Sequence, residues 1–316
     1  MFKKLLTIML ITTVGVGLSG CNIAGNKKEV DKQDAKASKI KVVASINPVR
    51  EFALAVGGDK VEVNTLVPEG VETHDFEPKP KDIEMLSKAH IFAYSGVGME
   101  GWLDKVLQAV SSKKNLNIVD TSEGATLMKI DGTNHNEDTE EDDEHDIGEY
   151  DPHLWLSLKE AKVQALNIRD ALIKVDEKNK DYYEKNYTEF AGKLDSLYEE
   201  YKKKIEVLPN KNFVTGHNAF AYLCRDFGLT QKGISGIRAQ GEPTPQKMKE
   251  LVEHAKKNNI KTIFMEEMAS PKVSETLAKE VGAKVEKIYT IENKEDNKTY
   301  LEMMKDNLEK IYNSLK

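Results

Sequence analysis

Three histidines and one glutamate stand out because their side chains could together bind a divalent metal. They are His74 in Glu-Thr-His-Asp-Phe-Glu-Pro, His153 in Asp-Pro-His-Leu-Trp, His217 in Thr-Gly-His-Asn, and Glu292 at the end of Tyr-Thr-Ile-Glu. Three neutral imidazoles and one carboxylate supply three nitrogens and one oxygen, which suits a tetrahedral zinc ion. The sequence therefore offers a candidate zinc site with four ligands.

The four candidate ligands lie far apart in the sequence. A zinc finger or a helical His-Glu-x-x-His motif groups its ligands within short stretches. Here each ligand needs its own loop, so only the folded chain can build the site. This spacing favours a protein that captures a metal between two halves of the molecule over one that uses the metal to staple a small domain.

The elements that must position these residues alternate along the chain, which predicts parallel sheets covered by helices on both faces. The expected strands are 39–46, 61–67, 89–96, 116–120, 212–215, 229–237, 262–265 and 284–291. The expected helices are 48–56, 81–88, 102–110, 156–175, 177–207, 219–227, 245–258, 271–281 and 299–315. Ligands of open α/β sheets bind beyond the carboxyl ends of strands, and His74, His217 and Glu292 each follow an expected strand.

The fold class predicted from this pattern is α/β, with two lobes that each contain a mostly parallel sheet flanked by helices. We expect an N-terminal lobe at 39–175, a C-terminal lobe at 208–316 and one long rigid linking helix at 176–207. That helix would be on the order of 45 Å long at 1.5 Å per residue. Its apolar residues fall near one stripe, which predicts that they belong to the core and not to a ligand site.

The N-terminus has the pattern of a lipoprotein signal peptide, expected at 1–20. Lys3 and Lys4 precede an apolar run at 5–18, and Leu-Ser-Gly-Cys ends at Cys21. The run is too short for a membrane-spanning helix, which needs about 20 residues. We expect Cys21 to carry the lipid, and the charged residues that follow, to position 38, to form a flexible tether. The protein would then lie on the extracytoplasmic face of the cell membrane, held by a lipid anchor.

Composition excludes several classes of function. With Cys21 lipidated, Cys224 is the single remaining cysteine, so no intrachain disulfide is expected. The net charge of −7, without a basic stripe, argues against a nucleic-acid partner.

A metal site closed by four protein ligands has no open position for an activated water, so we expect no enzyme. We expect a monomer, and the richness in Lys, Asn and Glu suggests a Gram-positive source.

An acidic segment at 131–150 interrupts the alternation of strands and helices. It contains His135 and His145 among many carboxylates, and its charge predicts a solvated surface loop. One interpretation is a solubilising insertion. The other is an auxiliary loop that collects metal weakly through these two histidines.

Together, the motifs at 71–80, 151–157, 213–223, 234–245 and 263–285 resemble the zinc-uptake branch of the metal-binding lipoproteins that serve ABC transporters as substrate-binding proteins. The resemblance covers nearly the whole chain after the tether. It implies two α/β lobes joined by a rigid helix, with a zinc ion buried between them. It also implies that the metal is handed to a permease in the same membrane, and that His74, His153 and His217 are metal ligands.

The fourth ligand stays open between three glutamates. Glu292 matches the zinc-type position, whereas Glu266 and Glu267 end another strand and are rivals. Manganese-type members tend to replace the third histidine with a carboxylate, so His217 favours zinc. A manganese- or iron-binding member of the same family, or a surface adhesin that uses the same fold, are the alternative functions.

Overall fold

The computed structural model describes residues 38–130, 148–239, 241–266 and 271–316. The expected signal peptide, Cys21, the tether up to residue 37, His135, His145 and Glu267 lie outside these residues. Within the described part of the chain, no helix combines the length and the apolar character needed to cross a membrane. Residues Lys39–Lys316 form one compact unit.

The first half of this unit contains a parallel sheet of four strands. They are β1 (Ile40–Ala44), β2 (Val61–Thr65), β3 (Ile91–Tyr94) and β4 (Asn117–Asp120), in the order β2-β1-β3-β4. The helices of this half are α1 (Asn47–Gly57), α2 (Pro80–Ser87), α3 (Leu103–Val110) and α4 (Leu158–Val175). Val42, Val43 and Ala44 are all buried, as expected for a central strand that is covered on both faces.

The second half repeats the same arrangement. Its strands are β5 (Asn212–Thr215), β6 (Thr230–Gly233), β7 (Thr262–Met265) and β8 (Lys284–Lys287), all parallel in the order β6-β5-β7-β8. Its helices are α6 (Ala221–Phe227), α7 (Pro245–Lys257), α8 (Pro271–Val281) and α9 (Tyr300–Ser314). In each sheet the strand order reverses at the first strand, and the carboxyl ends at such a switch point form a crevice that favours ligand binding.

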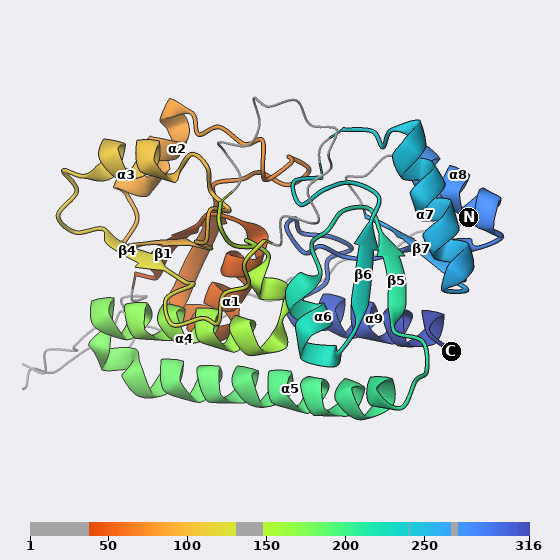
Figure 1. Cartoon of the computed structure of the whole chain (residues 1–316). Helices are drawn as coiled ribbons and strands as arrows, with labels where there is room; N and C mark the ends of the chain where they lie inside the picture. Colours follow the sequence, from red (N-terminus) through yellow and green to blue (C-terminus); the bar gives the residue numbers. More distant parts are fainter. Residues whose placement is uncertain (1–37, 131–147, 240, 267–270) are drawn as a thin grey trace, which may run out of the picture. The chain divides into compact units, whose positions relative to one another are not determined.

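The long helix α5 (Lys180–Glu206) has 27 residues and contacts α1, α4, α6 and α9, so it runs along both halves (Figure 1). A 3-10 turn at Glu177–Asn179 precedes it. The expected helix 177–207 therefore starts three residues later as an α-helix. The carboxylate of Asp176 accepts hydrogen bonds from Asn179 Nδ2 and Tyr183 OH, which stabilises the break between α4 and α5. The structure confirms the predicted α/β fold with two parallel sheets and a long helix.

The expected strand 284–291 is too long, because β8 ends at Lys287. Asn307 of α9 takes the place of a neighbouring strand at the next residues: its Oδ1 accepts from Tyr289 N at 2.9 Å, and its Nδ2 donates to Tyr289 O at 2.7 Å. The chain thus leaves the sheet before it reaches Glu292. The expected strand 229–237 likewise ends early, at Gly233.

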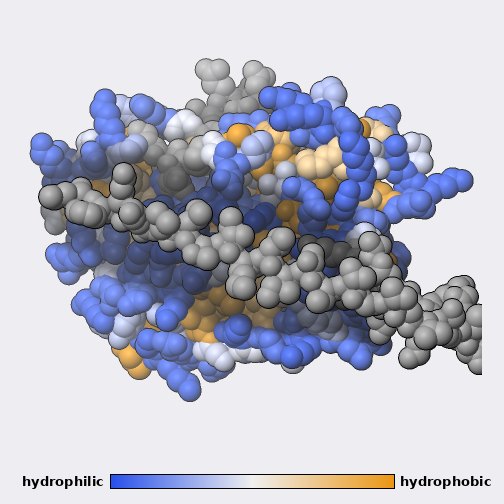
Figure 2. Space-filling view, turned by 180° about the vertical axis from the view of Figure 1, so that it is seen from behind, coloured by the Kyte–Doolittle hydropathy of each residue, from blue (hydrophilic) through white to orange (hydrophobic). Residues whose placement is uncertain are grey.

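One large hydrophobic cluster joins the two halves. Phe52 of α1 lies 4.8 Å from the ring of Tyr300 in α9 and 6.0 Å from that of Phe190 in α5, measured between ring centroids. A second, smaller cluster fills the space between the second sheet and helices α7 and α8. Seen from behind, hydrophilic side chains dominate the visible described surface, and hydrophobic residues show in smaller patches between them (Figure 2).

Candidate metal site

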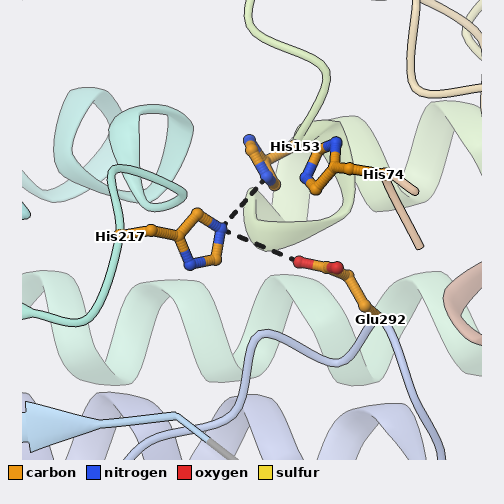
Figure 3. Close-up of side chains that lie close together, drawn as sticks. All are labelled: His74, His153, His217 and Glu292. Carbon is orange, nitrogen blue, oxygen red and sulfur yellow. Dashed lines mark hydrogen bonds and ion pairs between the residues drawn. The ribbon is translucent and has the colours of Figure 1, made fainter. Parts of the chain in front are cut away.

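The four side chains singled out in the sequence meet at one point (Figure 3). His74, His153, His217 and Glu292 each offer one ligand atom, and these four atoms lie within 4.8 Å of one another. His217 Nε2 is 3.4 Å from His153 Nε2 and 3.8 Å from Glu292 Oε1. A tetrahedral zinc ion with bonds of about 2 Å places neighbouring ligand atoms roughly 3.3 Å apart, so small shifts suffice to close the set around an ion.

Two buried polar atoms of this cluster receive no hydrogen bond from the described residues, although Glu292 Oε1 lies 3.8 Å from His217 Nε2. Among the described residues, neither His74 Nε2 nor Glu292 Oε1 has a hydrogen-bond partner. His153, His217 and Glu292 are all buried. Buried polar atoms almost always have partners. Two such atoms without a hydrogen bond at the same point fit a site for a ligand that accepts their lone pairs, namely a cation.

His217 is oriented by Glu266. The residue follows β5 by one glycine, and Glu266 follows the neighbouring strand β7. Glu266 Oε1 accepts from His217 N at 3.0 Å, and Oε2 lies 2.5 Å from His217 Nδ1. A Cβ at Gly216 would lie 2.8 Å from Glu266 Oε2, so only glycine admits this approach. The structure thus places Glu266, expected as a rival fourth ligand, behind the ring and outside the cluster of four.

His153 is oriented by Asp151 in the same way. The residue precedes a 3-10 turn at Leu154–Leu156, and Asp151 Oδ1 accepts from His153 N at 2.8 Å and lies 2.9 Å from His153 Nδ1. Tyr222 OH of α6 donates to Asp151 O at 2.8 Å. With Nδ1 engaged, Nε2 is the nitrogen that faces the cluster. Such carboxylate partners fix the tautomer and ring orientation of metal-binding histidines.

His74 lies in the loop between β2 and α2. Its ring centroid is 5.4 Å from that of His153 and 6.4 Å from that of His217. The backbone nitrogen of His74 donates to Glu72 Oε1 at 3.4 Å, and Phe76 packs edge-on against Trp102. The aromatic pair anchors the far side of the loop in the core, while Glu72 stays outside the cluster of four.

Glu292 reaches the cluster through an unusual backbone turn and not from a strand end. Ile291 has φ of 67°, which places a β-branched residue in the left-handed region. Such residues rarely adopt this conformation. It redirects the chain after β8 so that the Glu292 side chain points toward the three histidines (Figure 3).

The charges of the cluster favour a cation. Burial alone would lower the pKa of His217, but the carboxylates of Glu266, Glu292 and Glu72 outweigh it and raise that pKa to about 9. Burial, with His153, His217 and Arg238 nearby, lowers the pKa of His74 to about 2. The protein without metal therefore carries a proton on His217 among several carboxylates. A divalent ion can take the place of that positive charge.

A small cavity of about 60 Å³ adjoins the cluster and is lined by Glu72, Glu266 and Glu292 among other residues. Pockets for organic ligands typically measure 300–1,000 Å³. The space therefore fits an ion with a few waters and is too small for an organic metal chelate.

Comparison with known proteins identifies the family. The family model described as "Zinc-uptake complex component A periplasmic" matches residues 42–314. The chain belongs to this family. As a member of the zinc-uptake family it is a metal-binding, substrate-binding component of an ABC transporter and not an enzyme. The resemblance found in the sequence is thereby confirmed.

Relatives in the family are named for different metals. The high-affinity zinc uptake system protein ZnuA of Bacillus subtilis is 36% identical over 100% of this chain and 99% of its own length. The manganese ABC transporter substrate-binding lipoprotein PsaA of Streptococcus anginosus is 30% identical over 99% of both chains.

A solved structure of the same architecture is the laminin binding protein Lmb of Streptococcus agalactiae. It is 35% identical, covers 88% of this chain and 100% of its own, and has a TM-score of 0.77. It is described as a bifunctional protein with adhesin and metal transporting activity. The likeness therefore extends over nearly all the described residues.

Proposed function

We propose that this protein captures Zn²⁺ outside the cytoplasmic membrane and delivers it to an ABC-type permease in the same membrane. The observation that carries the proposal is the convergence of His74, His153, His217 and Glu292, whose ligand atoms lie within 4.8 Å of one another. Three imidazole nitrogens and one carboxylate oxygen match the preferences of zinc. The zinc is cargo, bound tightly and then released.

The choice of zinc over manganese rests on the third imidazole. Manganese favours oxygen-rich, six-coordinate sites, whereas imidazole suits zinc. His217 is held by Glu266 with its Nε2 toward the cluster, so the third nitrogen ligand is built into the second sheet. Family members named for zinc and for manganese both match this chain, so manganese is the alternative cargo that they support; iron is a further alternative on sequence grounds alone.

The route to the membrane is part of the proposal. Cys21 would carry the lipid after removal of residues 1–20, and the tether would allow the folded unit to reach the permease. Names of relatives that include "lipoprotein" support this anchor. In this setting we expect the protein to act as a monomer.

Elemental analysis of protein purified without added metal tests the cargo. We expect one zinc per chain, and a loss of tight binding in His153→Ala and Glu292→Ala. His254→Ala is the control, because His254 lies on α7 and contacts Asn258, away from the cluster. Stoichiometric manganese or iron would replace zinc in the proposal, and no bound transition metal would overturn it.

Adhesion is a second candidate function, favoured only by the likeness to Lmb. Binding of the purified protein to immobilised laminin, with and without zinc, tests it. Saturable binding that His153→Ala retains would establish an activity independent of metal capture.

A further inference from the structure

We propose that Asn47 is a positioning residue for the metal ligand Glu292, held across the seam between the two halves of the chain. This inference rests on the proposed function. Asn47 is the first residue of α1 and follows the end of β1 after two residues, whereas Glu292 lies in the loop after β8 of the second sheet. The two are distant in sequence, yet the backbone on both sides of Glu292 is bound by this one asparagine.

Asn47 donates to three successive carbonyl groups. Its Nδ2 donates to Ile291 O at 3.1 Å and to Asn293 O at 3.0 Å, and its backbone nitrogen donates to Glu292 O at 3.3 Å. Asn47 is only 5% exposed, so these bonds are shielded from water. Both hydrogens of the amide are used, which fixes the orientation of the side chain as well as that of the loop.

Other donors of the first half complete the contact. Trp155 Nε1 donates to Thr290 O at 2.7 Å, so all four carbonyls of residues 290–293 accept hydrogen bonds from the first half of the chain. In return, Asn293 Oδ1 accepts from Gly70 N at 3.1 Å and its Nδ2 donates to Val71 O at 3.3 Å. Residues 70 and 71 begin the approach to His74, and Trp155 lies two residues after His153.

The segment needs this external support because it lacks support of its own. β8 ends at Lys287, and no strand in the described part of the chain pairs with residues 290–293. Ile291 adopts φ of 67°, a conformation that persists only where surrounding contacts over-determine it. The bonds from Asn47 lie on both sides of Glu292 and select this turn. The carboxylate that completes the cluster is therefore placed by an amide that never touches the metal.

This arrangement divides the ligand set unevenly between the two halves. His74 and His153 belong to the first half by sequence, and Glu292 is bound to it through Asn47 and Trp155. His217 is held by Glu266 of the second sheet. Loss of the Asn47 amide should therefore detach one ligand from the frame that holds two others, while the fold stays intact.

The test compares zinc affinities, measured by competition with a chromophoric chelator, for the native chain, Asn47→Ala, Asn47→Asp, Glu292→Ala and the double variant Asn47→Ala with Glu292→Ala. Loss of an outer hydrogen-bond partner of a metal site typically weakens binding 10–100-fold. We expect a loss of about that size for Asn47→Ala and Asn47→Asp. Asp keeps the shape of Asn47 but removes both side-chain donors.

Asn186→Ala is the matched control. Asn186 of α5 also donates its Nδ2 across the structure to a backbone carbonyl, that of Val56 at the other end of α1, at 2.9 Å. It lies away from the cluster, so native zinc affinity is expected. Thermal unfolding of each metal-free variant records any general loss of stability separately.

The double variant separates positioning from a general structural effect. If Asn47 acts through Glu292, Asn47→Ala should weaken binding less than about twofold once Glu292 is already alanine. Equal losses in both backgrounds, or native affinity in Asn47→Ala beside a weakened Glu292→Ala, would overturn the inference and leave the proposed function intact. A native chain that binds no zinc would instead overturn the proposed function itself.

Discussion

The carboxylate of Glu266 contacts His217 with both of its oxygens: Oε2 lies 2.5 Å from the ring Nδ1, and Oε1 accepts a hydrogen bond from the backbone nitrogen at 3.0 Å. The two residues follow the neighbouring strands β5 and β7 of the second sheet. With Nδ1–H donated to a carboxylate, the lone pair of the neutral ring lies on Nε2, the atom that faces His153 and Glu292. The contact thereby fixes both the direction and the basicity of the third imidazole.

Removing the charge of Glu266 should weaken zinc binding without abolishing it. In Glu266→Gln the side chain keeps its size but no longer stabilises a positive charge on the ring. We expect a 10–100-fold loss of the pH-independent affinity with one zinc still bound, measured by chelator competition at several pH values because the lower pKa of His217 also reduces proton competition. Glu280→Gln, at an exposed position of α8, is the control. A complete loss of zinc would indicate that Glu266 is itself a ligand.

Gly216→Ala should disturb the same contact from the backbone side. The added methyl group would lie 2.8 Å from Glu266 Oε2, and relieving such a clash in a packed region costs about 1–3 kcal/mol. We expect lower thermal stability together with weaker zinc binding. Gly192→Ala, in the middle of α5, serves as the comparison, because a Cβ there meets no atom of the described residues within 4 Å. That change should stabilise the protein by about 0.5–1 kcal/mol; similar behaviour of the two variants would contradict the prediction.

Zinc binding should release a proton from His217. Its pKa is raised to about 9 in the protein without metal, so the ring is protonated at pH 7 and must lose that proton before Nε2 can bind zinc. Protons therefore compete with zinc below pH 9. The contribution of this group to the apparent affinity should rise about tenfold per pH unit up to pH 9 and then level off. His74, with a pKa near 2, adds no competition in this range.

Calorimetry in buffers of different ionisation enthalpy measures this release. At pH 7.5 we expect His217 to contribute about one proton per zinc, and a smaller release in Glu266→Gln, because the pKa of His217 falls when the neighbouring charge is removed. Equal zinc affinity at pH 5 and pH 7.5 would refute the competition.

Shortening the acidic segment should leave the main site intact. Ile130 N donates to Glu149 O at 3.1 Å, and Lys129 pairs with Tyr150, so the ends of the segment are adjacent and a short turn can join them. His153 keeps its support from Asp151 and Tyr222 in such a variant. We expect tight binding of one zinc to persist, while any weaker equivalents that depend on His135 and His145 disappear. Loss of the tight site would assign the segment a direct role in it.

The sequence predicted the three histidines of the site but not the residues that orient them. Each histidine lies in a short motif that matches the family the sequence resembles, and His74 and His217 each follow an expected strand. These cues predicted the residues that the structure brings together. Strand ends were harder to predict. β8 stops at Lys287 because the Asn307 side chain of α9 binds the backbone groups of Tyr289, and the local sequence pattern does not predict this contact.

The supporting residues could not be assigned from sequence because their roles depend on which strands become neighbours. Glu266 and Glu292 both follow predicted strands and carry the same carboxylate. Only the pairing of β5 with β7 shows that Glu266 reaches the far nitrogen of His217. Asn47 is a still clearer case, since its three acceptors come from the opposite end of the chain. Its position just beyond β1, at a strand's carboxyl end, is the one signal that could have drawn attention to it.

The aromatic contact of Phe52 with Phe190 and Tyr300 bears on how this molecule matures. Helices α1, α5 and α9 share one hydrophobic cluster. The hydrophobic core is therefore incomplete until the C-terminal helix has been synthesised. Because this core is built from apolar side chains and not from metal ligands, we expect the protein to fold without metal, unlike a zinc finger, whose folding depends on its ion. The carrier would then be folded and empty before it collects its first ion.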